Sequence, residues 1–580
     1  MSTRPEENVA DRLSLAVVGA VAGVALYLLF DLVPEMVSNR RLVLLLATVG
    51  ASFFAVLLAL LGPQPLRRAA SAAGALALPA TALFVWASFR FDEPERYLES
   101  GHAVGALGLL LAIAAPFLAS ALEVEGGWRR YPLLFDTAWS IVVRYSAAGL
   151  FVGVVWAVLL LSDALLSLVG VTVIEDLIEL DPVPWLISGI ALGLGLAIVH
   201  ELRDYISAFL FIQLLRVLLP LLLIVLVVFI LALPIQGLSG LFGTLSPAAT
   251  LAGVTLAAVT LISAVLHRDA GAEAEGRILR RSAQVLSVLI VVPASLAVYA
   301  VAVRIGQYGL TPDRIAAMTV ALVILAYALG YAGSVVLRAG WMARMRRVNL
   351  GLALVTIAVA ALWLTPVLNP ERMSAASQLA RAERGAAPES LPIWEFTHEW
   401  GRPGKRALAQ LRAMEAHPQH ERILALIGHA RNVEYRYQFE LEADGDTAPG
   451  LDGLIPVQPA GATLPEGALD GLSAPQRRSL REACARRLPG GGAGCVMVVA
   501  DFDSRVEGRQ AILFLLHAGG FVQVSSYHFR DDGAPWIRGV NGLESRIAPE
   551  TMERIQAGEF SLEPSEGRVL SIGEHRLYPD

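Results

Sequence analysis

Long apolar blocks recur along residues 13–368, separated by short polar loops. Each block is close to the roughly 20 residues that an α-helix needs to cross a bilayer. The block over 210–233 contains one charged residue, and the block over 285–303 contains none. The pattern predicts an all-α polytopic membrane bundle with about 11 transmembrane helices, because spanning helices are the segments that require such runs.

The first block, 13–33, is longer than the apolar region of a signal peptide, so we expect it to be a retained helix. Residues 131–145 predict an interfacial helix leading into the fifth span, with Asp136 and Arg144 facing the cytoplasmic surface. The expected spans are 13–33, 42–61, 69–88, 103–122, 147–169, 183–199, 210–233, 247–266, 285–303, 316–336 and 350–368.

After Pro370 the composition becomes that of a soluble protein. Apolar and polar residues alternate over 433–441, which is typical of a half-buried strand, and the runs 496–501, 511–517 and 521–529 also predict strands. Helices are expected over 406–414 and 421–430. The sequence thus predicts two domains, a multi-pass transmembrane helical domain over 1–370 and a soluble α+β domain over 371–580.

Arginines gather in alternate loops, which sets the expected orientation. The groups within 67–68, 129–130, 268–281 and 338–347 all lie in even-numbered loops, and basic short loops favour the cytoplasmic side. We therefore expect a protein of the bacterial cytoplasmic (inner) membrane with a cytoplasmic N-terminus. Eleven spans place the C-terminal domain in the periplasm. The arginines that oppose this orientation are Arg40, Arg41, Arg90, Arg96, Arg304 and Arg314.

Cys484 and Cys495 are the only cysteines of the chain. An exported domain can join them in a disulfide, which is worth roughly 3 kcal/mol for so short a loop in the chain-entropy model. Two unrelated buried thiols are the alternative. The spacing matches no zinc-ligand pattern, so we expect neither a metal site nor another cofactor.

The stretch Arg304 to Arg314 predicts a tight corner between the ninth and tenth spans. Gly309 can adopt a positive φ, Thr311 is a good N-cap, and Pro312 suits the first helical position. The structural interpretation is a re-entry turn with two interfacial arginines. The functional one is an anion or lipid-headgroup contact that also involves Gln307 and Tyr308.

This same stretch, together with the proline-containing helix 218–234, resembles the bacterial membrane-protein family catalogued as domain of unknown function 4153. The resemblance covers roughly residues 130 to 370 and is strongest at 304 to 314. It implies an integral membrane protein and does not imply an activity, because the activity of that family is uncharacterised.

Two ionisable residues fall within expected spans, where a charge costs a few kcal/mol at the bilayer centre. Asp163 lies in the fifth span or close to its outer end, and it is either a proton or cation site or a group near the headgroups. Arg216 lies in the seventh span, four residues before Pro220. Its long stem can carry the charge back to the membrane surface.

The charge pattern and the absence of known motifs make several classes of function less favoured. The chain carries a net charge of −6, and the residues after Pro370 hold 23 of its 46 basic and 29 of its 52 acidic residues. The membrane part is therefore neutral overall, and no basic stripe suggests nucleic acid as a partner. No P-loop, nucleophile elbow or metalloprotease motif is present, so an enzyme is not favoured and no catalytic residue is assigned.

Three hypotheses follow. The first is a non-enzymatic inner-membrane protein whose bundle contacts membrane lipid and anchors an exported domain that binds an envelope protein or a cell-wall component. The alternative is a transporter or channel for a small solute or ion, suggested by the prolines within the spans and by Asp163. The third is an enzyme acting on lipid-linked substrates, with Arg304, Tyr308 and Arg314 as headgroup contacts.

Overall fold

The computed structural model divides into two compact units, 1–427 and 428–580, which we describe separately. The predicted domain boundary at 370/371 marks the end of the membrane spans, whereas the compact units divide 57 residues later, after Ile427. The structure describes residues 5–61, 64–201, 208–236, 247–266, 277–439, 451, 453–464, 468–469, 472, 474–502, 508–517, 520–529, 536–538, 540–541, 547–564, 568–572 and 575–579.

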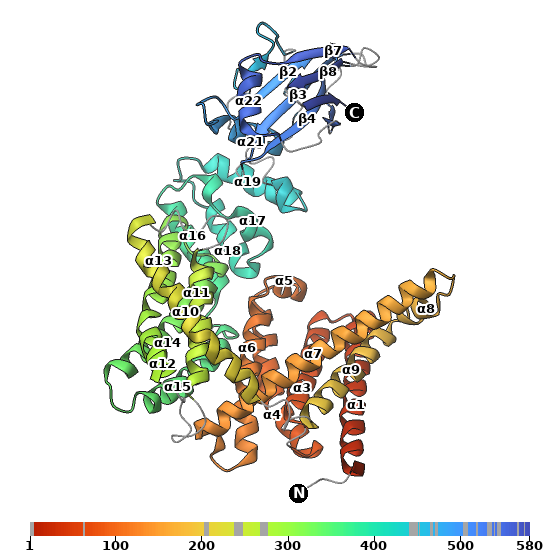
Figure 1. Cartoon of the computed structure of the whole chain (residues 1–580), viewed down its shortest axis with the longest axis vertical. Helices are drawn as coiled ribbons and strands as arrows, with labels where there is room; N and C mark the ends of the chain where they lie inside the picture. The colour runs from red at the N-terminus through yellow and green to blue at the C-terminus, as the bar shows by residue number, and fades with distance from the viewer. Residues whose placement is uncertain are drawn as a thin grey trace. The chain divides into compact units, whose positions relative to one another are not determined.

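The described part of the first unit contains 11 stretches that are long and apolar enough to cross a bilayer (Figure 1). The predicted fold class, a polytopic helical bundle followed by an α+β region, is confirmed. The spans are formed by α1 (Pro5–Tyr27) with the π-helical turn η1 (Leu28–Leu32) and α2 (Val33–Met36), α3 (Arg40–Leu60), α4 (Leu66–Ser88), α6 (His102–Glu123), α7 (Tyr131–Ser167), α9 (Pro182–Glu201), α10 (Ala208–Gln236), α11 (Pro247–Val265), α12 (Arg277–Leu289) with α13 (Val291–Tyr308), α14 (Pro312–Val336) and α15 (Trp341–Trp363).

Helix α7 differs from expectation. Its 37 residues form one continuous helix, so no separate interfacial helix precedes the fifth span. Arg144 is 5% exposed rather than facing the surface. One of its guanidinium nitrogens donates to the carbonyl oxygen of Leu61, the residue that ends α3. The buried charge is held there because the last carbonyls of a helix have no partner within the helix.

Helices α1 and α9 pack at very short distance through glycines. Gly19 and Gly23 of α1 face Gly189 and Gly193 of α9, and a Cβ on Gly189 would overlap the carbonyl oxygen of Gly19. In each helix the two glycines are four residues apart, the spacing that lets membrane helices bring their backbones together. Van der Waals contact between backbones holds this pair, because apolar burial gives little drive inside a lipid environment.

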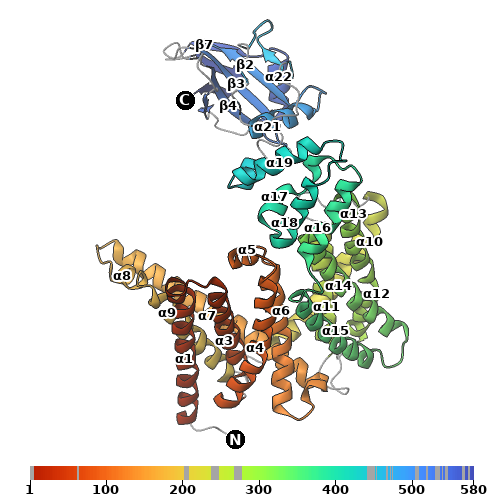
Figure 2. The same cartoon turned by 180° about the vertical axis from the view of Figure 1, so that it is seen from behind.

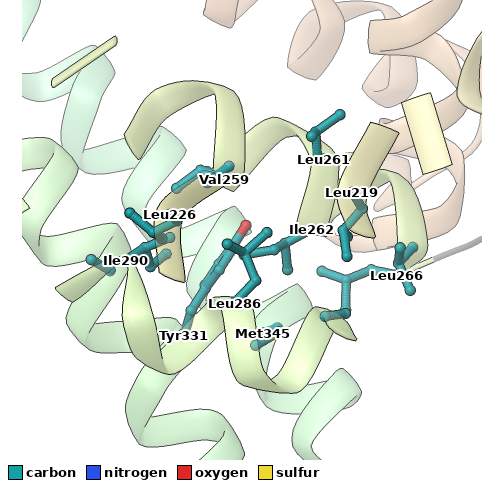
Figure 3. Close-up of a cluster of buried hydrophobic side chains, with 14 of the residues drawn as sticks. Leu219, Leu226, Val259, Leu261, Ile262, Leu266, Leu286, Ile290, Tyr331 and Met345 are labelled. Carbon is teal, nitrogen blue, oxygen red and sulfur yellow. The ribbon is translucent and has the colours of Figure 1, made fainter. Parts of the chain in front are cut away.

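The largest buried cluster of the bundle lies among α10, α11, α12, α14 and α15 (Figure 3). Leu226, Ile262 and Leu286 meet in it around the ring of Tyr331, which is fully buried. The phenol oxygen of Tyr331 has hydrogen-bonding partners, described below, as a buried hydroxyl requires. This cluster fixes the positions of α11, α14 and α15, which together form part of a cavity.

Short helices outside the spans complete the first unit. They are α5 (Pro94–Glu99), η2 (Gly127–Arg129), α8 (Val173–Ile178), α16 (Pro370–Glu383), η4 (Pro388–Ser390), α17 (Ile393–His398), α18 (Gly401–Arg412) and α19 (His420–Asn432), of which α19 continues into the second unit. Helix α16 packs on α14 and α18, and so covers one end of the bundle. We call this end the α16 end.

A buried ion pair anchors α16. Arg90, which follows α4, lies 3.4 Å from the carboxylate of Glu371 in α16, and both side chains are less than 10% exposed. Arg90 also donates to the carbonyl oxygens of Trp363, Thr365 and Leu368 at the end of α15. Burial raises the pKa of Glu371, although the charge of Arg90 opposes the shift. One arginine therefore ties α4, α15 and α16 together.

The second unit is built on a five-stranded sheet with the order β1 (Val457–Gln458), β2 (Cys495–Ala500), β3 (Arg509–Leu516), β4 (Val522–Phe529), β5 (Trp536–Arg538). Strands β2 to β5 are antiparallel neighbours, and β1 is parallel to β2. Figure 2 shows β2, β3 and β4 side by side. A four-stranded sheet has the order β6 (Val540–Asn541), β9 (His575–Pro579), β8 (Arg568–Ile572), β7 (Ser561–Pro564).

Both faces of the five-stranded sheet are buried. Cys495, Met497 and Leu513 point to one face, where α21 (Ala474–Ala485) packs. Val496 and Ile512 point to the other face, where α22 (Pro549–Gln556) and β8 contribute apolar side chains. Successive residues of a strand alternate between faces, so one short apolar run fills two cores.

The strand expected over 433–441 is wrong within the described residues, because 436–439 are helical. The rings of Tyr435 and Tyr437 stack on each other, and both side chains are more than half exposed. The alternating pattern therefore reflects aromatic stacking on a surface segment. Most of the predicted long loop 443–471 lies outside the described residues.

Candidate functional site

A cavity of about 630 Å³ lies within the bundle, between helices α6, α7, α11, α14 and α15. Its walls are mostly apolar and include Leu109, Phe135, Val259, Ile324 and Leu350. The volume falls in the range of about 300–1,000 Å³ that ligand pockets occupy.

Four polar side chains form a hydrogen-bonded cluster at one side of this cavity. Tyr131, Ser263 and Asn349 line the cavity directly, and Tyr331 lies behind them. The amide nitrogen of Asn349 donates to Tyr131 Oη at 3.0 Å and to Ser263 Oγ at 3.4 Å. Tyr331 Oη donates to the amide oxygen of Asn349 and lies 2.8 Å from Ser263 Oγ.

The cluster has one more donor hydrogen than it can use internally. Three hydroxyls and one primary amide supply five hydrogens, whereas four hydrogen bonds join these groups. This surplus does not depend on which way the Asn349 amide is turned, because turning it exchanges the roles of its atoms without changing the total. With the amide as placed, the hydroxyl hydrogen of Tyr131 is the unused donor.

Three threonines of the cavity wall have their hydroxyl hydrogens occupied. Thr260, Thr319 and Thr356 each donate to the backbone carbonyl oxygen one helical turn earlier. Such bonds are the usual way in which a helix satisfies its own hydroxyls in an apolar setting. These three threonines therefore present methyl groups to the cavity. Tyr327, which is hydrogen-bonded to Thr356, and Trp139 are further polar side chains of the lining.

The corner at 304–314 is packed against α16. Gly309 has a φ of +75°, and the Thr311 side chain accepts from the backbone nitrogen of Arg314, with Pro312 at the start of α14. The Gln378 side chain of α16 donates to the carbonyl oxygens of Tyr308 and Leu310. The corner thus serves as a contact surface for α16.

The structure brings three of the predicted headgroup residues together. The guanidinium carbons of Arg304 and Arg314 lie 5.7 and 5.4 Å from the ring centre of Tyr308. Arg314 also donates to the carbonyl oxygens of Tyr308 and Gly309, which end α13. Gln307 is exposed. Arg314 therefore already stabilises a helix end, whereas Arg304 is exposed beside it.

Arg216 is 8% exposed, so its side chain is covered by protein. Its Nε donates to the carbonyl oxygen of Ala264 at 2.9 Å, and a terminal nitrogen donates to Gln213. Ala264 is in the last turn of α11. Six other arginines donate in the same way to carbonyl oxygens at or just after the end of a helix. The arginine and the helix whose end accepts are Arg41 and α4, Arg90 and α15, Arg144 and α3, Arg314 and α13, Arg344 and α14, and Arg346 and α11.

Asp163 lies in α7, four residues before its end. Its side chain is partly buried, and its Oδ1 is buried without a hydrogen-bond partner in the described part of the chain. No cluster of three or more His, Cys, Asp or Glu side chains suited to a metal occurs among the described residues. Asp163 is not among the residues that line the cavity.

Cys484 and Cys495 form a disulfide that joins α21 to β2, with their Cα atoms 4.7 Å apart. Cys495 is fully buried and Cys484 is 6% exposed. The bond lies in the core between α21 and the five-stranded sheet.

We compared the chain with known proteins. No family model, curated protein or solved structure matches it. The chemistry of this chain must therefore be argued from its own residues.

Sequence reasoning missed the polar cluster. Tyr131, Ser263, Tyr331 and Asn349 come from four helices, and each is unremarkable alone. The one available signal was Asn349, an amide that follows the arginines of α15 at the start of its apolar run. Apart from Tyr331, its hydrogen-bond partners Tyr131 and Ser263 are more than 80 residues away in the sequence.

Proposed function

We propose that this protein is a non-enzymatic protein of the bacterial cytoplasmic membrane, whose bundle holds the C-terminal unit in the periplasm, where that unit binds an envelope protein or a cell-wall component. The Cys484–Cys495 disulfide is the observation that carries this proposal. Disulfides persist in the periplasm and are rare in the cytosol, where thiols are kept reduced. The loop arginines favour the same side by an unrelated argument.

Four of the six arginines that oppose this orientation donate to carbonyl oxygens of the protein, which supports the proposal. Arg41 donates to the carbonyl oxygens of Phe91 and Asp92, and Arg96 donates to that of His398. Arg90 and Arg314 make the bonds described above. A residue needed inside the fold is retained for that reason, so it carries less information about membrane orientation than exposed loop arginines such as those at 67–68 and 129–130.

The location of the C-terminus tests the proposal directly. Reporters active only in the periplasm or only in the cytoplasm are fused after Asp580, and a fusion truncated after Arg130 serves as the control for the opposite side. We expect periplasmic activity after Asp580 and cytoplasmic activity after Arg130. Thiol alkylation of the denatured protein should find Cys484 and Cys495 protected until a reductant is added. A cytoplasmic C-terminus with free thiols would overturn the proposal.

The binding role needs a second experiment. A chain truncated after Ile427 keeps the first compact unit, and it should insert in the membrane yet reproduce the defect of a full gene deletion. A truncated chain that behaves like the intact protein would remove the binding role and leave the topology untouched.

A second candidate function is transport of a small solute or ion, favoured by the buried, unpartnered Oδ1 of Asp163. Ionisable groups in spans often mark proton or ion pathways. Asp163→Asn should then abolish flux in proteoliposomes while the protein stays folded, and an unchanged flux would exclude Asp163 from transport. Membership of the family catalogued as domain of unknown function 4153 is likewise a proposal, resting on residues 304–314.

A further inference from the structure

We propose that the bundle cavity binds one acyl chain of a lipid, whose carbonyl oxygen accepts the surplus hydrogen of the Tyr131, Ser263, Tyr331 and Asn349 cluster. This goes beyond the proposed function and does not depend on it, because the cavity lies wholly within the first unit.

The hydrogen count defines the polar end of the ligand. A buried donor without a partner costs about 1–3 kcal/mol, so the surplus hydrogen favours an occupant that brings an acceptor. The cluster consists of two phenols, one alcohol and one amide, none of which is charged near neutral pH. A carbonyl oxygen of an ester or a carboxylic acid is an acceptor that these neutral groups satisfy.

The position of the cluster along the helices is also consistent with a lipid carbonyl. Tyr131 is the first residue of α7, and Ser263 is two residues from the end of α11. The cluster lies away from the α16 end, because Tyr331 is five residues before the end of α14 and Asn349 is eight residues after the start of α15, whereas the opposite ends of these two helices are bonded to α16 or to Arg90 beside it. The cluster therefore lies near the edge of the hydrocarbon region, where the interfacial layer that holds the ester groups of lipids begins.

The walls define the rest of the ligand. From the cluster, the lining continues along α6 and α14 through Ile113, Phe117, Val320 and Val323. These positions are near the middle of their helices, so the cavity extends from the interface into the apolar depth. A long saturated or unsaturated chain matches this shape, because each buried methylene contributes about 0.8 kcal/mol when it leaves water and no polar group is needed along it.

The test is native mass spectrometry of the full chain released from detergent micelles, using phospholipid and free fatty acid of defined mass as probes. We expect one retained acyl lipid for each wild-type chain, and its mass distinguishes a phospholipid from a fatty acid. Tyr131→Phe removes the hydroxyl and keeps the ring, and the unused hydrogen then belongs to the Asn349 amide, whose nitrogen lies 3.0 Å from the position of the lost oxygen. A carbonyl placed against the hydroxyl no longer reaches a donor, so retention should weaken roughly 5- to 10-fold, the value of one hydrogen bond.

Two further variants keep the test decisive. Ala353→Phe and Ala138→Phe fill the cavity from different helices, and the one that retains the wild-type elution profile should lose the bound lipid. Tyr299→Phe is the matched control, because Tyr299 is an exposed tyrosine of α13 that does not line the cavity. Equal retention in all variants would show lipid bound to the outer surface only. That result would overturn the proposal, and so would wild-type protein that retains no lipid.

Discussion

In the helical bundle, buried arginines of one helix donate to the last carbonyls of another, whereas in the second unit a disulfide and two apolar sheet faces join the elements. The solvent explains the difference. A sheet in water is stabilised by removing apolar area at about 25 cal/mol per Å². Helices in lipid gain little from that, so short backbone contacts and hydrogen bonds to unpaired carbonyls carry more of the packing.

Replacing Arg90 should destabilise the bundle more than any other change proposed here. Arg90→Ala removes the donor to three carbonyls and leaves Glu371 buried without its partner. We expect a loss of about 3–5 kcal/mol in the free energy of unfolding, as for other broken buried pairs. Denaturant titration in detergent micelles measures it. Arg40→Ala is the control, because its pair with Glu95 is exposed and worth at most about 1 kcal/mol.

The same variant has a predictable pH dependence. Without Arg90, burial is the largest influence on the pKa of Glu371 and keeps its folded pKa above the unfolded value, while a backbone hydrogen bond and His102 act in the opposite direction. A carboxyl of this kind stabilises the fold fully below its unfolded pKa, and that contribution is lost as the pH rises toward the folded pKa. The deficit of Arg90→Ala should therefore shrink at acidic pH, and a deficit that grows on acidification would contradict this account.

The disulfide provides the corresponding test of the second unit. Cys484→Ala together with Cys495→Ala should lower its free energy of unfolding by about 3 kcal/mol, because the reduced chain regains loop entropy. Pulse proteolysis of the full chain in urea reports this unit, and the bundle should be unaffected. Wild-type protein treated with reductant is the matched comparison and should shift by a similar amount. An unchanged urea midpoint would mean that the sheet faces alone set the stability of this unit.

The glycine contact of α1 and α9 tests the role of short backbone contacts in the bundle, with a smaller expected loss of stability. Gly189→Leu should cost about 1–3 kcal/mol, because the new side chain meets the backbone of α1 and the helices must separate. Gly149→Leu is the control, since a Cβ at that exposed position of α7 meets nothing within 4 Å. Thermal unfolding in micelles compares the two, and equal effects would show that the contact is not limiting.

The sequence by itself determined the spans and most of the sheet. Apolar runs of bilayer length predict membrane helices, and the short apolar runs at 496–501 and 511–517 predict strands without knowledge of any partner. The corner at 304–314 was also readable, because glycine, threonine and proline act on their immediate neighbours.

Only the tertiary structure decided what the polar residues of the bundle do. Arg144 and Arg216 were expected at surfaces, yet each lies against the end of a helix that is distant in sequence. The cluster of Tyr131, Ser263, Tyr331 and Asn349 likewise exists only where four helices meet. An unpaired helix carbonyl or an unused donor hydrogen is satisfied by whichever side chain lies close to it in the fold. The residue pattern of one segment does not determine which other helix will lie beside it.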